Sequence, residues 1–453
     1  MLKGIFTNAP HVPRTQAFLD SRDMIKNPVF VFEKYRKELG PTFSFHFGGA
    51  RPSIVSTDPE FIKQVLKTRR NNFHKSDIQV ERMVEFQGKG LVNSHGEAWL
   101  RQRRLLARGF RANRLTDRLP MQQDVLNDLM SRFEEDAAEG PVDMHQQMVR
   151  FTLRLVGKSL FGRSMSEDEL EQIGDTITEI QSFIVRQIVQ PYLIPWFQFS
   201  GQSKHFQNLR IEGDKIILRH IQQRREEGTG EADFLRILLE EPYHDTGQPM
   251  SEEQVLIESL QLMVAGNETS SNGLTWVFYL LGKHPEYIDQ IRAEIETVIG
   301  SDPIGFKNLH QLDVAVRVID EALRLYPPFW MIDRIALEDD EICGIKIPKG
   351  TMVIPYIYGS HRNLEHWRDP EVFDPDRFLP QRHKPRNPYS YIPFGAGPRV
   401  CIGNSMAIMQ MLLILVAFVR KYDFRLANEE DVAIRPMMLL RPDGPIQMQF
   451  QPR

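Results

Sequence analysis

The sequence predicts a mainly α-helical fold with a small strand-rich lobe, formed as one domain over residues 1–453. Helical periodicity dominates the chain from Pro59 to Pro327. Alternating or strand-like segments gather near residues 40–57 and 329–360. A rule of about 150 residues per domain suggests roughly three domains. No Pro-, Gly- or Ser-rich linker divides the chain, and one domain is therefore favoured.

Composition excludes several classes of protein. The chain has 56 Lys and Arg against 60 Asp and Glu, a net charge of −4, which argues against a nucleic-acid binder. Hydrophobic residues make up 41% of the chain, enough for a folded core. Two cysteines, Cys343 and Cys401, are too few for a disulfide scaffold, an iron-sulfur cluster or a zinc site built on sulfur.

The first elements are a hairpin and a series of long helices. Residues 42–48 alternate with period two, and residues 52–56 follow a Gly-Gly turn, as in a hairpin. Ser251 is expected to cap a later helix that runs to about Gly282. Between them, amphipathic patterns predict helices over residues 59–69, 121–135, 144–161, 167–189 and 208–227.

The C-terminal third combines short strands, a long irregular segment and one apolar helix. Strands are expected within 341–347 and 351–356, whereas 363–391 has no period and is too long for an ordinary connection. The apolar run 411–419 is shorter than the roughly 20 residues that span a bilayer. Residues 1–30 contain no stretch typical of a signal peptide or membrane anchor. We therefore expect a soluble, cytoplasmic protein.

The most informative segment is the glycine-rich loop 394–403, which contains Cys401 and leads into an apolar helix. A helix N-terminus stabilises a thiolate, and a thiolate can bind iron. The neighbouring residues suit a flat acidic ligand: glycines permit close approach, an arginine can pair with an acidic group, and an aromatic ring can shield the sulfur (Gly397, Gly403, Arg399 and Phe394). For a cysteine in an arbitrary glycine loop, the alternative is a small buried packing residue.

The pattern Phe-x-x-Gly-x-Arg-x-Cys-x-Gly resembles the haem-thiolate loop of the cytochrome P-450 family. The resemblance implies that family's fold, with haem b bound non-covalently between an oxygen-activating helix and the helix after Cys401. Cys401 is the implied axial ligand of the iron, with Phe394, Arg399 and Gly403 around the cofactor. Cys343 lacks such a setting, and we expect it to be a packing residue.

Glu321 and Arg324 form a Glu-x-x-Arg pair on one helical face. Such a pair alone is common on surface helices and contributes little. In the resembled family it is joined by an arginine that matches Arg377. The resemblance therefore implies a buried structural network of these three residues that holds the cysteine loop.

Residues 265–270 carry a glycine inside a strong helical pattern. This segment resembles the family's oxygen-activating helix, in which Ala265 and Gly266 leave room for dioxygen and Glu268 and Thr269 deliver protons. The alternative for Gly266 is close packing between helices.

Further residues match positions that contact haem propionates in the family. Trp99 and Arg103 share a helical face, Arg334 matches a propionate-binding arginine, and His95 is a possible neighbour or an ordinary surface histidine. A different face of the helix carries a basic set that is either solvated or a landing patch for an acidic electron donor: Arg101, Arg104 and Arg108.

The implied activity is a monooxygenase that activates O2 and hydroxylates or O-dealkylates a small organic substrate. Electrons are expected from NAD(P)H through separate proteins, a ferredoxin or flavodoxin and its reductase, because the chain leaves no room for a fused flavin domain. The alternatives are a peroxide-driven peroxygenase and a non-catalytic haem-thiolate sensor. The substrate class stays open among fatty acids, terpenoids, aromatic and methoxy compounds. The expected pocket residues are Phe183, Ile184, Leu262, Trp330 and Met331.

Overall fold

The computed structural model describes residues 6–162, 165–228, 233–309, 311–382, 386–428 and 430–453. The chain forms two compact units, each assembled from three separate segments. Unit 1 comprises Met1–Ser76, Arg317–Cys401 and Val432–Gly444. Unit 2 comprises Asp77–Val316, Ile402–Asp431 and Pro445–Arg453.

Unit 1 is built around a mixed sheet of strand order β1-β2-β8-β5-β3. These strands span Thr42–Phe47, Arg51–Ser56, Met352–Pro355, Arg334–Ala336 and Phe73–His74 in that order. The hairpin pairs antiparallel from Thr42 opposite Ser56 to Phe47 opposite Arg51, and β2 pairs parallel with β8. The predicted hairpin and strand-rich lobe are thus confirmed.

The sheet of unit 1 carries a core of aromatic residues. Phe32 packs edge-on against Phe43, Phe45 and Tyr356, and all four are buried. Edge-to-face aromatic contacts add to the free energy gained by burial. The remaining elements of unit 1 are α1 (Arg14–Leu19), α2 (Ser21–Lys26), α3 (Pro28–Leu39), α4 (Pro59–Lys63), most of α16 (Asp313–Leu325), α17 (Ile357–Ser360), and the hairpins β6–β7 (Asp340–Ile342, Ile345–Ile347) and β10–β11 (Ile434–Pro436, Leu440–Pro442).

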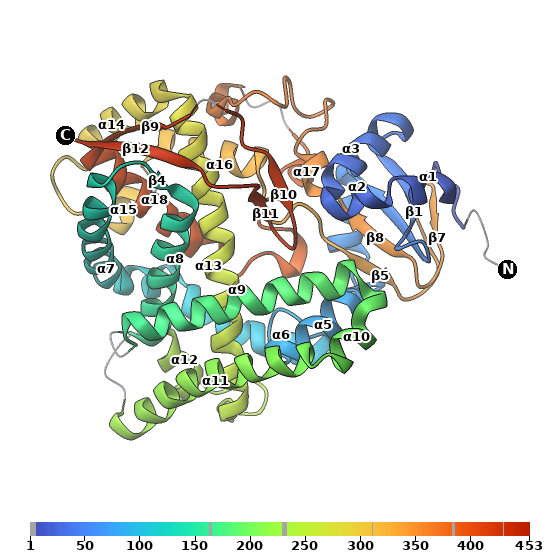
Figure 1. Cartoon of the computed structure of the whole chain (residues 1–453), viewed down its shortest axis with the longest axis horizontal. Coiled ribbons are helices and arrows are strands. Elements are labelled where there is room, and N and C mark those ends of the chain that lie inside the picture. The colour runs from blue at the N-terminus through green and yellow to red at the C-terminus, as the bar shows by residue number, and fades with distance from the viewer. Residues whose placement is uncertain (1–5, 163–164, 229–232, 310, 383–385, 429) are drawn as a thin grey trace. The chain divides into compact units, whose positions relative to one another are not determined.

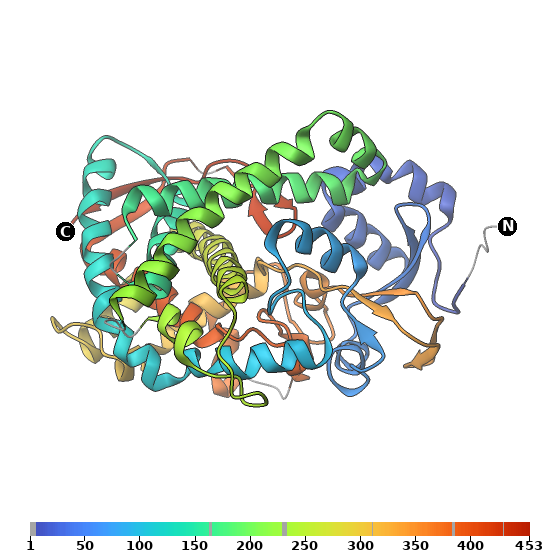
Figure 2. The same cartoon turned by 90° about the horizontal axis from the view of Figure 1, so that it is seen from below.

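Unit 2 is mainly helical and is organised around α13 (Glu252–Lys283), against which α8 (Met144–Phe161) packs. Figure 2 looks nearly along α13, and both views show α9 (Glu167–Val189) beside α11 (Gln202–Glu227) (Figures 1 and 2). The other helices are α5 (Asp77–Gln87), α6 (Gly96–Leu106), α7 (Ala112–Ala138), α10 (Ile194–Phe199), α12 (Phe234–Glu240), α14 (Pro285–Val298), α15 (Phe306–Leu309) and α18 (Asn404–Lys421). A small sheet of order β4-β12-β9 contains Val142–Asp143, Gln447–Pro452 and Tyr422–Leu426.

Side-chain caps fix where several of these helices begin. Ser251 accepts a hydrogen bond from the Gln254 N–H at 3.2 Å, which confirms the cap predicted for α13. Asp58 caps α4 through the Phe61 N–H at 2.7 Å. Beyond Lys63, the predicted helix 59–69 continues as a π-helical turn, Gln64–Thr68, instead of an α-helix.

Among the described residues, α18 is the one helix long and apolar enough to cross a membrane. Its side chains are largely buried inside the protein, with Leu413, Leu415 and Val416 at 0% exposure. Burial of this kind is typical of a core helix, and length and composition alone are weak evidence for a membrane span.

Candidate active site

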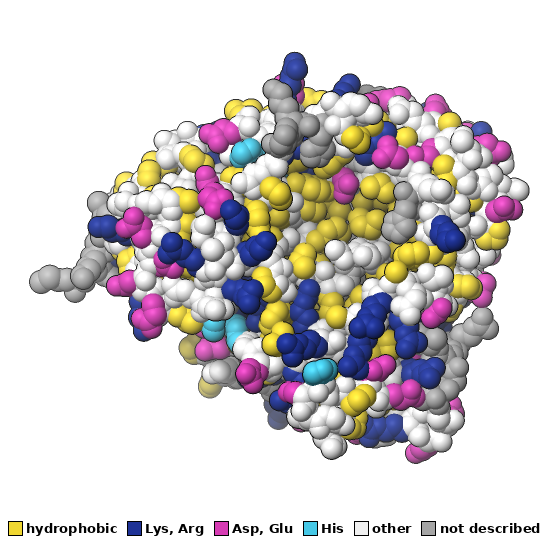
Figure 3. All heavy atoms as spheres, turned by 180° about the vertical axis from the view of Figure 1, so that it is seen from behind, with side chains coloured by type: hydrophobic (Ala, Val, Ile, Leu, Met, Phe, Trp, Pro, Cys, Tyr) yellow, Lys and Arg dark blue, Asp and Glu magenta, His cyan; other side chains and the backbone are white. Residues whose placement is uncertain are grey.

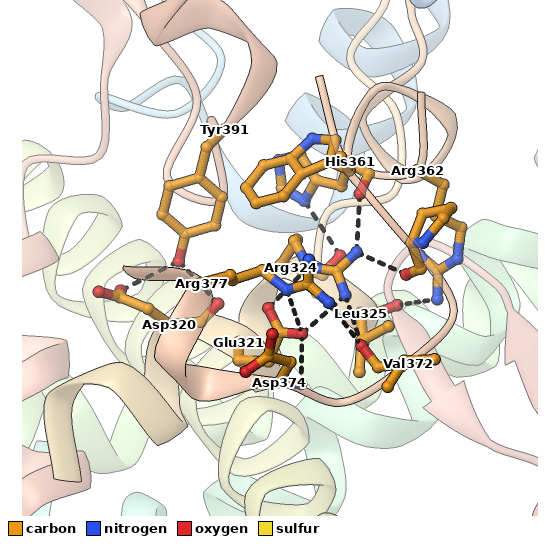
Figure 4. A network of polar contacts seen from close by, with 12 residues as sticks. Asp320, Glu321, Arg324, Leu325, His361, Arg362, Val372, Asp374, Arg377 and Tyr391 are labelled. Atoms are coloured by element: carbon orange, nitrogen blue, oxygen red, sulfur yellow. Dashed lines mark hydrogen bonds and ion pairs between the residues drawn. The ribbon is translucent and has the colours of Figure 1, made fainter. Parts of the chain in front are cut away.

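Glu321, Arg324 and Arg377 meet in a buried ion-pair network in unit 1 (Figure 4). Arg324 donates two hydrogen bonds to the Glu321 carboxylate, from Nε to Oε2 at 2.7 Å and from Nη2 to Oε1 at 2.8 Å. Arg377 Nε donates to the same Oε1 at 2.8 Å. The exposed fractions of Glu321 and Arg324 are 0%, so the charges are compensated by each other and not by water.

The remaining donors of both arginines bind backbone carbonyls of the irregular segment between residues 361 and 377. Arg324 Nη1 donates to His361 O at 2.9 Å and to Pro370 O at 2.7 Å. Arg377 donates to Arg368 O and Val372 O, both at 2.9 Å. The segment is therefore ordered by side-chain donors, which satisfy carbonyls that no helix or sheet pairs.

The cysteine loop ends immediately before α18. The Cys401 N–H donates to Phe394 O at 2.9 Å, and a 3₁₀ turn, Gly397–Arg399, lies between them. Gly397 has a φ of +70°, and a Cβ atom there would overlap the carbonyl oxygen of Leu66. A glycine is thus required at position 397 because the backbone of Leu66 lies so close to it. The Cys401 side chain is exposed.

Cys343 occupies a position different from the one expected. It has a φ of +51° in the turn between β6 and β7, and it is exposed. The expectation of a packing residue is wrong, because a tight hairpin turn places this side chain outward.

A cluster of cationic residues lies close to the cysteine loop within unit 1. Burial and the neighbouring guanidinium groups of Arg334 and Arg399 lower the pKa of Lys75 to about 7. Burial and the same two arginines also lower the pKa of His74. Asp333 partly offsets this charge, and its Oδ2 accepts a hydrogen bond from the Ser76 hydroxyl. Arg334 and Arg399 were predicted from the sequence, whereas His74 and Lys75 were missed because nothing in the pattern around them singles them out.

This concentration of positive charge suits a ligand that carries carboxylates. Repulsion among neighbouring cationic side chains lowers their pKa values, and an anion that binds between them relieves this repulsion. The set therefore fits the two propionates of haem, and the exposed Cys401 thiol offers the sulfur ligand that its iron requires. Lys and Arg side chains also gather over part of the face drawn in Figure 3.

In unit 2, α13 carries the predicted acid and alcohol on a segment packed against α8. Thr269 Oγ1 donates to Ala265 O at 2.6 Å, within the helix. A Cβ atom on Gly266 would lie 3.0 Å from Val156 Cγ2 on α8. The missing side chain of Gly266 therefore allows helix packing, and the assignment of its space to dioxygen is not supported. Ala265 is exposed, and its role in leaving room for dioxygen stays a prediction.

The predicted propionate contacts of unit 2 lie on or beside α6. Arg103 places its guanidinium 5.8 Å from the centre of the Trp99 ring, as their spacing of four residues predicts. His95 precedes the first residue of the helix and makes no side-chain cap to it. On the other face, Arg101 pairs with Asp245 at 2.8 Å and Arg108 pairs with Glu241. These pairs reduce the net charge of the expected landing patch.

Three of the five expected pocket residues are buried, and none of the five is among the residues that line the pocket found in unit 2. Trp330 is buried in the aromatic core of unit 1, where its Nε1–H donates to Met437 O at 3.0 Å. Phe183 is buried and stacks on Phe206 with ring centres 4.2 Å apart. Ile184 is also buried, whereas Leu262 and Met331 are half-buried.

Unit 2 contains a pocket, and some of its lining residues lie close in sequence to the expected pocket residues. It is lined mainly by apolar side chains of α5, α9, α11 and α13, among them Leu260 and Val264 on either side of Leu262. Helical spacing turns these two residues to one face and Leu262 to another. Its charged lining is an ion pair, Arg210–Asp214, with a separation of 3.2 Å.

Comparison with known proteins gives one consistent result. The cytochrome P450 family model matches residues 10–450. Cytochrome P450 3A6 of Oryctolagus cuniculus is 29% identical, over 91% of this chain and 85% of its own. Pentalenene oxygenase of Streptomyces avermitilis is 28% identical, over 86% and 85% of the two chains. The crystal structure of the cytochrome P450DA heme domain superposes with a TM-score of 0.87 at 22% identity, covering 98% of both chains.

Proposed function

Because the chain belongs to the cytochrome P450 family of haem-thiolate monooxygenases, we propose that it hydroxylates or O-dealkylates a small organic compound. The observation that carries the proposal is the cysteine loop of unit 1, with its exposed thiol near a cluster of cationic residues in which Arg334 is buried and Lys75 and Arg399 are half-buried. Haem would be held there by Cys401, with Lys75, Arg334 and Arg399 binding its carboxylates.

When bound, haem with a thiolate ligand supplies the activation of dioxygen and favours O–O cleavage. The chain's own residues supply the ligand, the protons and the exclusion of water. Thr269 carries a proton on Oγ1 and Glu268 precedes it on α13, an alcohol and an acid suited to proton delivery. This intact pair favours O2 over peroxide as the oxidant.

The lining of the unit 2 pocket favours a mainly apolar substrate, although the pocket as it stands, with a volume of about 20 Å³, has room for only about one water molecule. Its isoleucines, leucine, valine and phenylalanine favour hydrocarbon or aromatic surface. The substrate classes in keeping with this lining are fatty acids, terpenoids, and aromatic or methoxy compounds. Electrons would come from NAD(P)H through a separate ferredoxin or flavodoxin with its reductase, in the cytoplasm.

The proposal is tested first by spectroscopy of the purified holo-protein. The reduced protein is expected to give the red-shifted carbonyl band of a thiolate ligand, and Cys401→Ala is expected to lose it. A band that survives in Cys401→Ala would exclude this cysteine as the ligand.

The second test is turnover with a compound panel, selected by the spectral shift that reports displacement of water from the iron. With surrogate ferredoxin, reductase and NAD(P)H, a product that contains one atom of labelled O2 is expected. Product formed with peroxide alone would indicate a peroxygenase. A protein that binds carbon monoxide yet consumes no NAD(P)H with any compound would indicate a sensor.

A further inference from the structure

His361 lies between α16 and the segment before the cysteine loop, and it adds a connection that the ion pairs of Glu321 do not make. It follows α17 and is fully buried, with an exposed fraction of 0%. Its Nδ1 lies 3.2 Å from Arg324 O (Figure 4). Its Nε2 lies 2.9 Å from the backbone nitrogen of Ile392. One imidazole ring therefore joins α16 to the segment that leads into the cysteine loop.

These two contacts define the tautomer of the ring. The Ile392 N–H can only donate, so Nε2 is the acceptor and carries no proton. A carbonyl oxygen can only accept, so the proton lies on Nδ1 and is donated to Arg324 O. Burial, and then the charges of Arg324 and Arg362, lower the pKa of His361 to about 3, in agreement with a neutral ring.

The hydrogen bonds continue from Ile392 toward the cysteine. The Gly395 N–H donates to Ile392 O at 2.9 Å, and the Cys401 N–H donates to Phe394 O at 2.9 Å. Arg324 is thus linked to the backbone of Cys401 through His361 and the turn 392–395. Tyr391, the residue before Ile392, is held to the same helix, because its hydroxyl donates to Asp320 O at 2.9 Å.

We propose that His361 is a positioning residue for the Cys401 thiolate, because its Nε2 fixes the backbone at Ile392 from which the cysteine loop turns. The inference rests on the proposed function only in that Cys401 is taken as the haem ligand. Groups that orient a metal ligand from behind commonly tune it without touching the metal. Loss of the Nε2 bond frees the 392–395 turn and weakens the hold on the thiolate.

Two substitutions separate the two bonds of the ring. His361→Asn keeps a polar group near the Nδ1 position, facing Arg324 O, and is too short to reach Ile392. His361→Gln keeps an acceptor near the Nε2 position. Tyr35→Phe is the matched control: it removes another buried bond of unit 1, from the hydroxyl to Asp20 Oδ2 at 2.8 Å.

The measurement is the fraction of reduced, carbonyl-bound holo-protein that shows the thiolate band, and its rate of loss during mild heating. His361→Asn is expected to lose the band about tenfold faster than the wild type, while His361→Gln and Tyr35→Phe stay within about twofold of it. Hydrogen exchange of the holo-protein is expected to rise in residues 392–401 for His361→Asn alone.

Three results would overturn the inference. One is a thiolate band as persistent in His361→Asn as in Tyr35→Phe. Another is a loss in His361→Gln equal to that in His361→Asn, since the Ile392 acceptor would then be irrelevant. If His361→Asn does not accumulate as folded protein, a fast loss of the thiolate band in His361→Gln would likewise overturn the inference. A wild type without any thiolate band would instead refute the proposed function.

Discussion

Glu321 satisfies an unusual number of donors for one buried side chain. Its Oε1 accepts from Arg324, from Arg377 and from the Asp374 N–H at 2.9 Å, and its Oε2 accepts from Arg324 Nε. Breaking a buried ion pair by removing one partner leaves an uncompensated charge, which costs more than the pair contributes. The carboxylate therefore determines whether the two arginines can stay buried.

We predict that Glu321→Gln destabilises the protein by about 3–5 kcal/mol, because two buried guanidinium groups lose their counter-charge. Urea unfolding of the holo-protein measures this change. The control is Glu60→Gln, which breaks the exposed pair to Lys63 at 3.0 Å and should leave the unfolding midpoint almost unchanged. Equal losses in the two variants would show that burial of the network contributes nothing.

Gly397 allows a second residue-scale prediction. Gly397→Ala combines a positive φ with overlap of Leu66, whereas Gly350→Ala has a φ of +79° and nothing within 4 Å of its new Cβ. The left-handed conformation alone costs about 1–2 kcal/mol. Gly350→Ala should show only that loss, measured by thermal unfolding, while Gly397→Ala should lose more and also bind less haem. Similar haem content in both variants would contradict this reading of Gly397.

At the scale of elements, α13 holds the loop 88–94 through two polar side chains one turn apart. Gln261 accepts from the Val92 N–H at 2.9 Å and donates to Gly88 O at 3.1 Å. Glu258 accepts from the Leu91 N–H at 3.1 Å. Because Glu258 has an exposed fraction of 0%, this helix buries an ionisable group to pair loop backbone.

This buried carboxyl predicts a pH dependence of stability. Burial raises the pKa of Glu258 from 4.5 to about 7. Between these values the folded protein binds the proton more tightly than the unfolded chain, so the stabilisation from this group falls as pH rises from 4.5 to about 7. Glu258→Gln should flatten that part of the curve of unfolding free energy against pH. An unchanged slope would show that the carboxyl ionises in the folded protein as it does in water.

Elements with strong local signals are predicted well from the sequence. The expected helix 167–189 matches α9, which begins with a capping box of Ser166 and Glu169. The predicted helix 121–135 is the inner part of α7, which begins at Ala112 and continues through Pro120, a residue that usually interrupts helices. The burial of Trp330 and Phe183 depends on their tertiary neighbours, and apolar character alone does not predict which side chains each of them contacts.

At the scale of the whole molecule, the sequence does not reveal the division into two units. Glu321 and Arg377 are far apart in the chain, and their meeting was inferred from a family resemblance, since spacing alone does not predict such contacts. His361 was missed for the same reason: its role depends on Arg324 and Ile392, which lie on opposite sides of it in the sequence. Lys75 likewise gains significance only beside Arg334 and Arg399.

We nevertheless predict that the two units unfold together in one cooperative transition, as a single domain would. Each unit consists of three segments, so the chain passes between them after Ser76, Val316, Cys401, Asp431 and Gly444. Unit 1 cannot complete its sheet from one continuous segment, because β2 pairs with β8 from a distant part of the sequence. Hydrogen exchange of the holo-protein in increasing urea should therefore give one midpoint for β8 in unit 1 and α8 in unit 2. Exchange in β8 at clearly lower urea than in α8 would contradict the single-domain prediction and would make each unit a separate folding domain.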